Sequence, residues 1–163
     1  MNENPMLHNA EVLNPTSNAA AIARFDKRQG GNGVRHNEWM IYPNGAMRET
    51  GSPWGALIEP PEDNYQRLSN IVLYYQARLA NAVKQFDDLK HLLMMGDGSN
   101  PEGLDQLRQF REAVSVANAA VENAKQALAA TPKGKQLEAN RQYDAELRQR
   151  QQSFKDKIKA VRI

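Results

Sequence analysis

The sequence predicts a mainly α-helical fold. We expect an elongated antiparallel helical hairpin, or a three-helix coiled-coil bundle, behind a long irregular N-terminal arm with a small β-hairpin. Along residues 62–95 and 101–130, apolar residues recur at alternating spacings of three and four, which is the heptad pattern of packed helices. Thr131-Pro132 separates a third helical segment, residues 132–162, because proline moves the preceding residue out of the helical conformation. Residues 1–61 hold six of the eight prolines and six of the ten glycines, too many for a long helix.

Composition narrows the classes of protein further. The 163 residues are 40% hydrophobic and 7% aromatic, which suits one domain with an appendage, or long helices, better than a large enclosed core. The chain has no cysteine, which excludes disulfides, thiol catalysis and cysteine-ligated metals. It shows neither a signal peptide nor an apolar run of membrane-spanning length. We therefore expect a soluble, non-secreted protein without membrane contact, in the cytoplasm or within a virion or other large particle.

Two short elements are expected inside the arm, which covers residues 1–61. Residues 19–25 favour a short helix that ends before the glycines at 30–33. Residues 38–42 and 46–49 read as two strands joined at Asn44-Gly45, because this dipeptide tolerates the positive φ angles of a tight turn. An isolated two-stranded hairpin is marginal in water. This one is therefore expected to lean on the helices or on another chain.

The large apolar residues of the arm are the candidate partner contacts. Trp39, Ile41 and Trp54 are the expected anchors of the arm, which becomes ordered within an assembly because it is too poor in periodic apolar residues for a core of its own. Leu73 and Tyr74 project from the outer side of the segment 62–95. They are either buried under the arm or form a docking patch for another subunit.

The two heptads mirror each other about Gly98. If residues 96–100 form a turn, antiparallel pairing stacks Leu89 on Leu107 and Phe86 on Phe110. Glu62 and Asp63 are expected in the first turn of the first helix, and Ser99 or Asn100 caps the second. The seams consist of Tyr65, Leu68, Val72, Tyr75, Leu79, Ala82, Phe86, Leu89 and Leu93, and of Leu107, Phe110, Val114, Ala117, Val121, Ala124 and Leu128.

The third helix, 132–162, has a weaker seam. Thr131 is its expected cap, and its first half is polar along the seam. It is expected to dock on the hairpin through four apolar residues near its end, with its last turns beside the acidic residues at the hairpin turn. These four residues are Leu147, Phe154, Ile158 and Val161.

A column of basic residues runs along the same helix. Residues 132–163 carry nine basic and four acidic side chains, although the net charge of the chain is only +2. This column could neutralise the phosphates of a nucleic acid, or it could be an ion-paired flank of a coiled coil. The candidate contacts for an anionic partner are Arg141, Arg148, Lys155, Lys159 and Arg162.

Short motifs that resemble catalytic or ligand-binding sites lack the residues that the chemistry needs. His36-Asn37-Glu38 copies the His-x-Glu of zinc deaminases without their cysteines. Gly30-Gly31-Asn32-Gly33 has no Gly-Lys-Ser/Thr ending for a phosphate. Asp97-Gly98-Ser99-Asn100 lacks the remaining oxygens of a calcium loop. We therefore propose no catalytic, cofactor-binding or metal-ligating residue, and we expect no cofactor and no enzymatic activity.

The function expected from these features is structural. A helical scaffold with a long arm suits a non-enzymatic assembly protein whose partners are other subunits of a large complex that holds it in several copies. The specific expectation, drawn from architecture alone, is an accessory or minor protein of a virus or bacteriophage particle. The alternative is a nucleic-acid-associated accessory protein that uses the basic helix.

Overall fold

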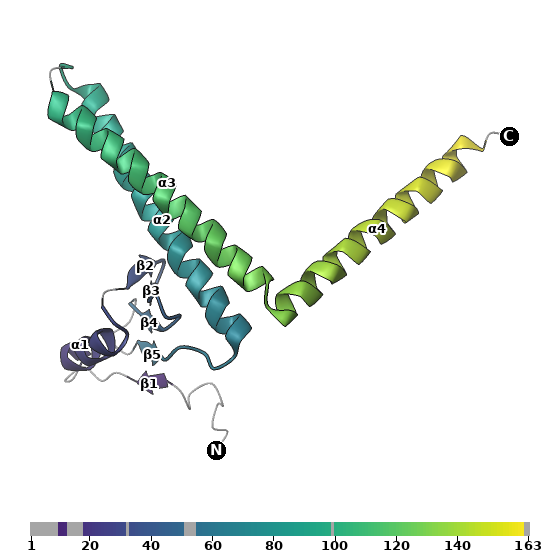
Figure 1. The fold of residues 1–163 in the computed structure, drawn as a ribbon, viewed down its shortest axis with the longest axis horizontal. Helices are drawn as coiled ribbons and strands as arrows, with labels where there is room; N and C mark the ends of the chain where they lie inside the picture. The colour runs from purple at the N-terminus through teal and green to yellow at the C-terminus, as the bar shows by residue number, and fades with distance from the viewer. Residues whose placement is uncertain (1–9, 13–17, 32, 51–54, 99, 162–163) are drawn as a thin grey trace.

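The structure is a computed structural model of the chain and describes residues 10–12, 18–31, 33–50, 55–98 and 100–161. A small sheet and a short helix form the N-terminal part, and two long helices lie side by side and lead to a third that points away (Figure 1). The described elements, in chain order, are β1 (Ala10–Val12), α1 (Asn18–Arg28), β2 (Val34–His36), β3 (Trp39–Ile41), β4 (Met47–Glu49), β5 (Ala56–Ile58), α2 (Asn64–Met95), α3 (Pro101–Ala129) and α4 (Pro132–Ala160).

The five strands in the described part of the chain form one antiparallel sheet in the order β1-β5-β4-β3-β2. In the pair of β3 and β4, Trp39 lies opposite Glu49 and Ile41 lies opposite Met47, which confirms the predicted β-hairpin. β2 and β5 extend this hairpin on its two sides. The expectation of an otherwise irregular arm is therefore wrong. Three-residue strands are too short to show a period in the sequence, and they depend on their neighbours for stability.

The loop between β3 and β4 explains why the hairpin forms here. The backbone N–H of Tyr42 donates to the carbonyl of Ala46, and that of Gly45 donates to the carbonyl of Tyr42, both at 3.0 Å. The side-chain oxygen of Asn44 accepts a further hydrogen bond from the N–H of Ala46. Gly45 has a φ of +89°, in the left-handed region that strains other residues, so the turn requires this glycine.

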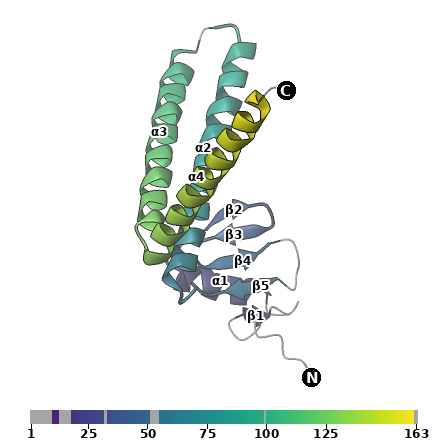
Figure 2. The same ribbon diagram turned by 90° about the vertical axis from the view of Figure 1, so that its right-hand side faces the viewer.

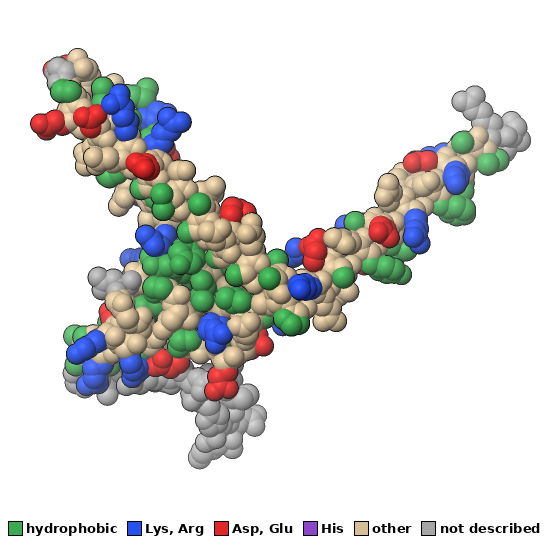
Figure 3. Space-filling model, in the orientation of Figure 1, with side chains coloured by type: hydrophobic (Ala, Val, Ile, Leu, Met, Phe, Trp, Pro, Cys, Tyr) green, Lys and Arg blue, Asp and Glu red, His purple; other side chains and the backbone are tan. Residues whose placement is uncertain are grey.

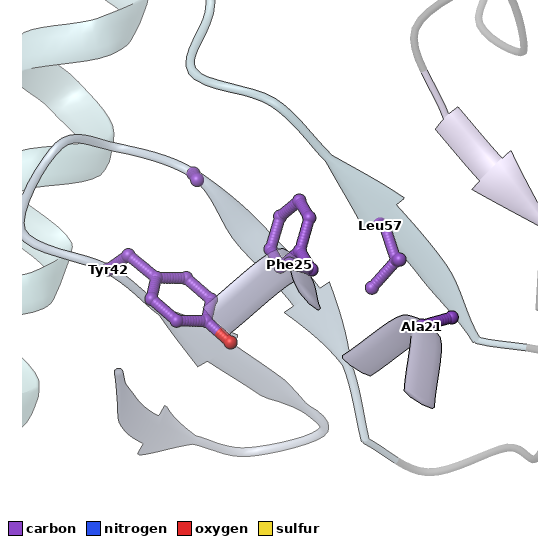
Figure 4. Close-up of a cluster of buried hydrophobic side chains, with 5 residues drawn as sticks. Ala21, Phe25, Tyr42 and Leu57 are labelled. Atoms are coloured by element: carbon purple, nitrogen blue, oxygen red, sulfur yellow. The ribbon is translucent and has the colours of Figure 1, made fainter. Parts of the chain in front are cut away.

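α1 covers one face of the sheet and supplies half of a small core. The aromatic rings of Phe25 and Tyr42 meet edge to face, with their centroids 5.4 Å apart. Leu57 of β5 and Ala21 of α1 complete this cluster together with Ala46 (Figure 4). Phe25 and Tyr42 are both fully buried. The arm therefore has a packed core of its own, although its sequence shows little periodicity.

One edge of this core is polar. The Tyr42 hydroxyl donates to the Asp26 carboxylate and accepts a hydrogen bond from Nε of Arg48 at 3.2 Å. Nε of Arg48 also lies 3.6 Å from the same carboxylate. Burial, with the hydrogen bond to Asp26 as a further cause, raises the pKa of Tyr42 from 10.0 to about 12. The neutral phenol is therefore the form that the folded protein stabilises.

This raised pKa predicts a loss of stability at alkaline pH. Below pH 10 both the folded and the unfolded protein hold the Tyr42 proton, so its full contribution is present. Between pH 10 and about 12 the unfolded chain releases the proton and the folded chain keeps it, so the free energy of unfolding falls by up to about 1.4 kcal/mol per pH unit. Urea titrations across this range should show that slope in the wild type and in Tyr143→Phe, an exposed control. A slope equally steep in Tyr42→Phe would contradict the assignment.

The sheet rests on the first half of α2. The Asn70 side chain donates to the carbonyl of Gly45 at 3.0 Å, which ties the β3–β4 loop to the helix. Asn70, Tyr74 and Ala77 are buried at helical spacing, and α2 contacts β2 and β3. Of the two interpretations of Tyr74, burial under the arm is therefore the one that the structure shows. Its neighbour Leu73 is exposed. The β-hairpin leans on its own helix.

α2 and α3 lie side by side and run in opposite directions (Figures 1 and 2). Every predicted seam residue is half-buried or buried, and beyond Ala77 the positions of α2 between them are exposed. At the far end, a Cβ on Gly103 would lie only 2.5 Å from Cδ2 of Leu93. Leu93 and Gly103 are the next pair after Leu89 with Leu107, so this contact agrees with the predicted antiparallel register.

The helix caps also agree with the sequence in two cases and differ in one. Asn100 caps α3 by accepting the N–H of Gly103 at 2.8 Å, and Thr131 caps α4 in the same way through Gly134. The first helix begins at Asn64, so Glu62 and Asp63 do not lie in its first turn as expected. Asp63 is instead the N-cap and accepts the N–H of Gln66 at 2.8 Å, because a short carboxylate satisfies a free helical N–H directly.

α4 does not join the hairpin. It leaves the end of α3 at a corner and extends away from α2, α3 and the sheet (Figure 1). No residue of Pro132–Ala160 is buried. The expected docking through Leu147, Phe154, Ile158 and Val161 is therefore wrong for a single chain, and the structure shows no three-helix bundle among its described residues. The physical reason is the junction between α3 and α4, whose backbone direction carries α4 away from the hairpin.

Candidate interaction surface

α4 presents large apolar side chains to solvent along its whole length. Their exposed fractions range from 37% for Leu137 to 79% for Val161, and Phe154 is 65% exposed. Burying each of these side chains would stabilise a contact by about 1.5 to 3 kcal/mol. Packing of α4 against another apolar surface is therefore favourable. The exposed apolar residues are Leu137, Tyr143, Leu147, Phe154, Ile158 and Val161.

The corner that orients α4 is built from Thr131 and Gly134. The Thr131 hydroxyl donates to the carbonyl of Leu128 at 2.7 Å and accepts the N–H of Gly134 at 3.0 Å. Thr131 is buried, and Pro132 follows as the first helical residue. A Cβ on Gly134 would lie 2.3 Å from the backbone oxygen of Leu128, so no larger residue fits. The direction of α4 is thus set by short backbone contacts.

A second contact holds the first turn of α4. Nζ of Lys133 lies 4.9 Å from the centre of the Tyr65 ring at the start of α2, within the range of a cation–π interaction. Tyr65 also lines a shallow groove at this corner together with Leu128 and Leu137. The start of α2 and the end of α3 therefore both contact the first turns of α4. The rest of α4 projects into solvent.

The basic side chains of α4 point into solvent (Figure 3). Arg141 and Arg150 form exposed ion pairs with Glu138 and Glu146 on the same helix, each at 3.9 Å. Such exposed pairs contribute about 0 to 1 kcal/mol. Among the described residues, Arg148, Lys155 and Lys159 form no ion pair, and Arg162 lies outside the described residues.

The two expected anchors of the arm that the structure describes, Trp39 and Ile41, do not form a common partner surface. Ile41 is fully buried inside the chain, so it anchors the sheet and is not available to another subunit. Its burial follows from pairing with both β2 and β4 beside α2. Trp39 is partly exposed in β3, opposite His36 and Glu49. Trp54 lies outside the described residues.

The tip of the α2–α3 hairpin is a second exposed surface. Leu92, Met94, Met95 and Leu104 are more than half exposed there. Further down, a groove between the helices is lined by Tyr75 and Arg78 of α2 and, on α3, by Gln109, Glu112, Ala113, Val116, Ala117 and Ala120. The small alanine side chains leave room for a neighbouring helix to approach closely.

The residues considered for metal or membrane chemistry form no such site in the described part of the chain. No group of three or more histidine, aspartate or glutamate side chains described in the structure is arranged to hold a metal ion. His36 lies exposed in β2. None of the described helices is both long and apolar enough to cross a membrane.

Two features of this surface escaped prediction from the sequence. Gly134 is essential to the corner, because no larger residue fits there. The only sign of this role in the sequence was a glycine three residues after the capping residue Thr131. Tyr143 adds an exposed ring beside the seam. Comparison with models of protein families, with curated proteins and with solved structures found no match. The function is therefore inferred from the exposed helix and the corner that orients it.

Proposed function

We propose that this protein is a non-enzymatic structural protein that holds subunits of a large assembly together. The observation that carries this proposal is α4, a 29-residue helix with no buried residue and with large apolar side chains exposed along it. Patches of this kind on soluble proteins mark interaction sites. At 1.5 Å per residue the helix reaches about 43 Å from the corner, far enough to engage a neighbouring subunit.

The hairpin and the sheet supply the body from which α4 projects. We propose that α2 and α3 form an antiparallel coiled coil, supported by the alternating burial of the seam residues and by the Leu93–Gly103 contact. The sheet widens its base by packing on α2 through Asn70 and Tyr74. The body therefore acts as a fixed support for the exposed helix. An accessory or minor protein of a virus or bacteriophage particle is the specific assembly role that we propose.

The alternative function is that of a nucleic-acid-associated accessory protein. It is favoured by Arg148, Lys155 and Lys159, which are exposed and form no ion pair with described residues. No aromatic side chain of α4 lies in this basic column, so phosphate contacts alone would carry the binding. The apolar seam of α4 would then remain exposed, and for this reason we favour a protein partner.

One experiment tests both functions. The protein is isolated from its native source in its complex, and the mass and the components of that complex are determined before and after nuclease treatment. The assembly role predicts a complex of defined mass that survives nuclease and contains other protein subunits. A chain recovered alone would contradict it. A complex that dissociates with nuclease, and whose affinity falls steeply with salt, would instead support the nucleic-acid role.

A further inference from the structure

The partner of α4 can be narrowed from its charges and length. α4 carries basic residues on both sides of its apolar seam, with Arg148 and Lys155 on one side and Arg150 and Lys157 on the other. Two copies of α4 packed against each other would bring these flanks together, and like charges at such positions oppose pairing. Its partner therefore needs acidic flanks and an apolar groove.

The hairpin of the protein has both features. The groove between α2 and α3 is lined mainly by small or apolar residues, with Glu112, Gln109 and Arg78 as its polar members. The Arg78 guanidinium lies 5.9 Å from the centre of the Tyr74 ring on its own helix. Residues 84–112 around the tip carry six acidic and four basic side chains. Two of those basic residues are engaged by neighbouring acids, Lys84 by Asp88 and Arg108 by Asp105. Glu102 and Glu112 form no ion pair with any described residue, so they are available to an incoming basic helix.

The lengths of the helices fit as well. α3 and α4 both contain 29 residues. When an α4 helix is laid antiparallel to α3 with the ends matched, Lys159 stands level with Glu102 and Arg148 stands one residue from the level of Glu112. Leu147 then stands level with Val114, and Phe154 stands level with Leu107. One alignment therefore brings a basic side chain close to both Glu102 and Glu112 and lays the exposed seam along α3.

An α4 helix cannot reach this groove on its own chain, because the Thr131–Gly134 corner directs it away from the hairpin (Figure 1). We infer that α4 of one copy docks on the α2–α3 hairpin of a second copy, antiparallel to its α3, and completes there a three-helix bundle between chains. This inference rests on the proposed assembly function and names its partner as a second copy of this chain. The same contact can be reciprocal in a dimer or repeat head to tail in a larger ring or filament.

Charge reversal tests this inference with the full chain. The first variant carries Arg148→Glu and Lys159→Glu, and the second carries Glu102→Lys and Glu112→Lys. All four positions are exposed on helices, so circular dichroism should show unchanged helix content. We expect the wild type to self-associate in sedimentation velocity. Each variant alone should associate only at a protein concentration at least about tenfold higher. A control with Arg24→Glu and Lys27→Glu on α1 changes the net charge as much as the first variant and should behave as the wild type.

The decisive measurement is the mixture of the two variants. Reversed α4 helices meet reversed hairpins in the mixture, and wild-type surfaces meet each other, so association should return to the wild-type level. Failure of the mixture to associate would overturn the inference. A wild type that stays monomeric alone but belongs to a native complex of other proteins would overturn it too, while the proposed assembly function would stand. If neither self-association nor a native complex is found, both proposals fail.

Discussion

Val121→Asp is expected to destabilise the α2–α3 hairpin strongly, with a loss of about 3 to 5 kcal/mol in the free energy of unfolding. Val121 is 3% exposed in the middle of the α3 seam, so an aspartate there loses its water without gaining a partner. Because native proteins are stable by only about 5 to 15 kcal/mol, such a loss removes a large part of the total. Helical circular dichroism during urea titration measures it.

Val116→Asp is the matched control for this change. It makes the same substitution five residues earlier in the same helix, at a position that is 65% exposed. The loss of helix propensity is shared by both variants, so their difference reports burial at the seam alone. Val116→Asp should cost less than about 1 kcal/mol. Equal midpoints for the two variants would show that α2 and α3 do not pack through the predicted seam.

Phe25→Ala has the second large expected effect and acts on the sheet. Phe25 is fully buried between α1 and the strands and packs edge to face on Tyr42. Removing a buried phenyl ring leaves a cavity and lost contacts, which together typically cost about 3 to 5 kcal/mol. We expect the N-terminal region of this variant to become sensitive to protease and the tryptophan fluorescence, to which the partly buried Trp39 contributes, to shift to the red.

Phe154→Ala serves as the control, because this phenylalanine is 65% exposed on α4. It should leave protease resistance and tryptophan fluorescence unchanged in dilute protein. Helical circular dichroism reports mainly on the long helices. In both variants it therefore shows whether a loss of structure is confined to the N-terminal region. If Phe25→Ala were as resistant to protease as the wild type, the cluster of Phe25, Tyr42 and Leu57 would not be the core of the N-terminal region.

The long helices could be predicted from the sequence because their signals are local. The expected boundaries 62–95, 101–130 and 132–162 lie within two residues of α2, α3 and α4. A cap, a proline and a heptad each act over a few residues, so they are visible in the chain before it folds. The β3–β4 hairpin was predictable for the same reason, since Gly45 marks its turn.

The five-stranded sheet was not visible in this way, and of the second buried face of α2 only Tyr74 was named in advance, as one of two interpretations. The strands contain three residues each, and their partners β1 and β5 are more than forty residues apart in the chain. Asn70 breaks the apolar pattern of its stripe, yet it is buried because its side chain bonds to the carbonyl of Gly45. A polar residue can replace an apolar one wherever its hydrogen bonds are satisfied, and that is decided by a distant segment.

The direction of α4 also depends on contacts that form only in the folded chain. The sequence places the start of this helix at Pro132 and its basic and apolar columns along it, because both follow from the helical period. Whether the helix folds back or projects depends on the close approach of Gly134 to the carbonyl of Leu128 and on Lys133 lying over Tyr65. The local code therefore specified the helices and their faces, while contacts between segments far apart in the chain set which faces are buried and which remain open to a partner.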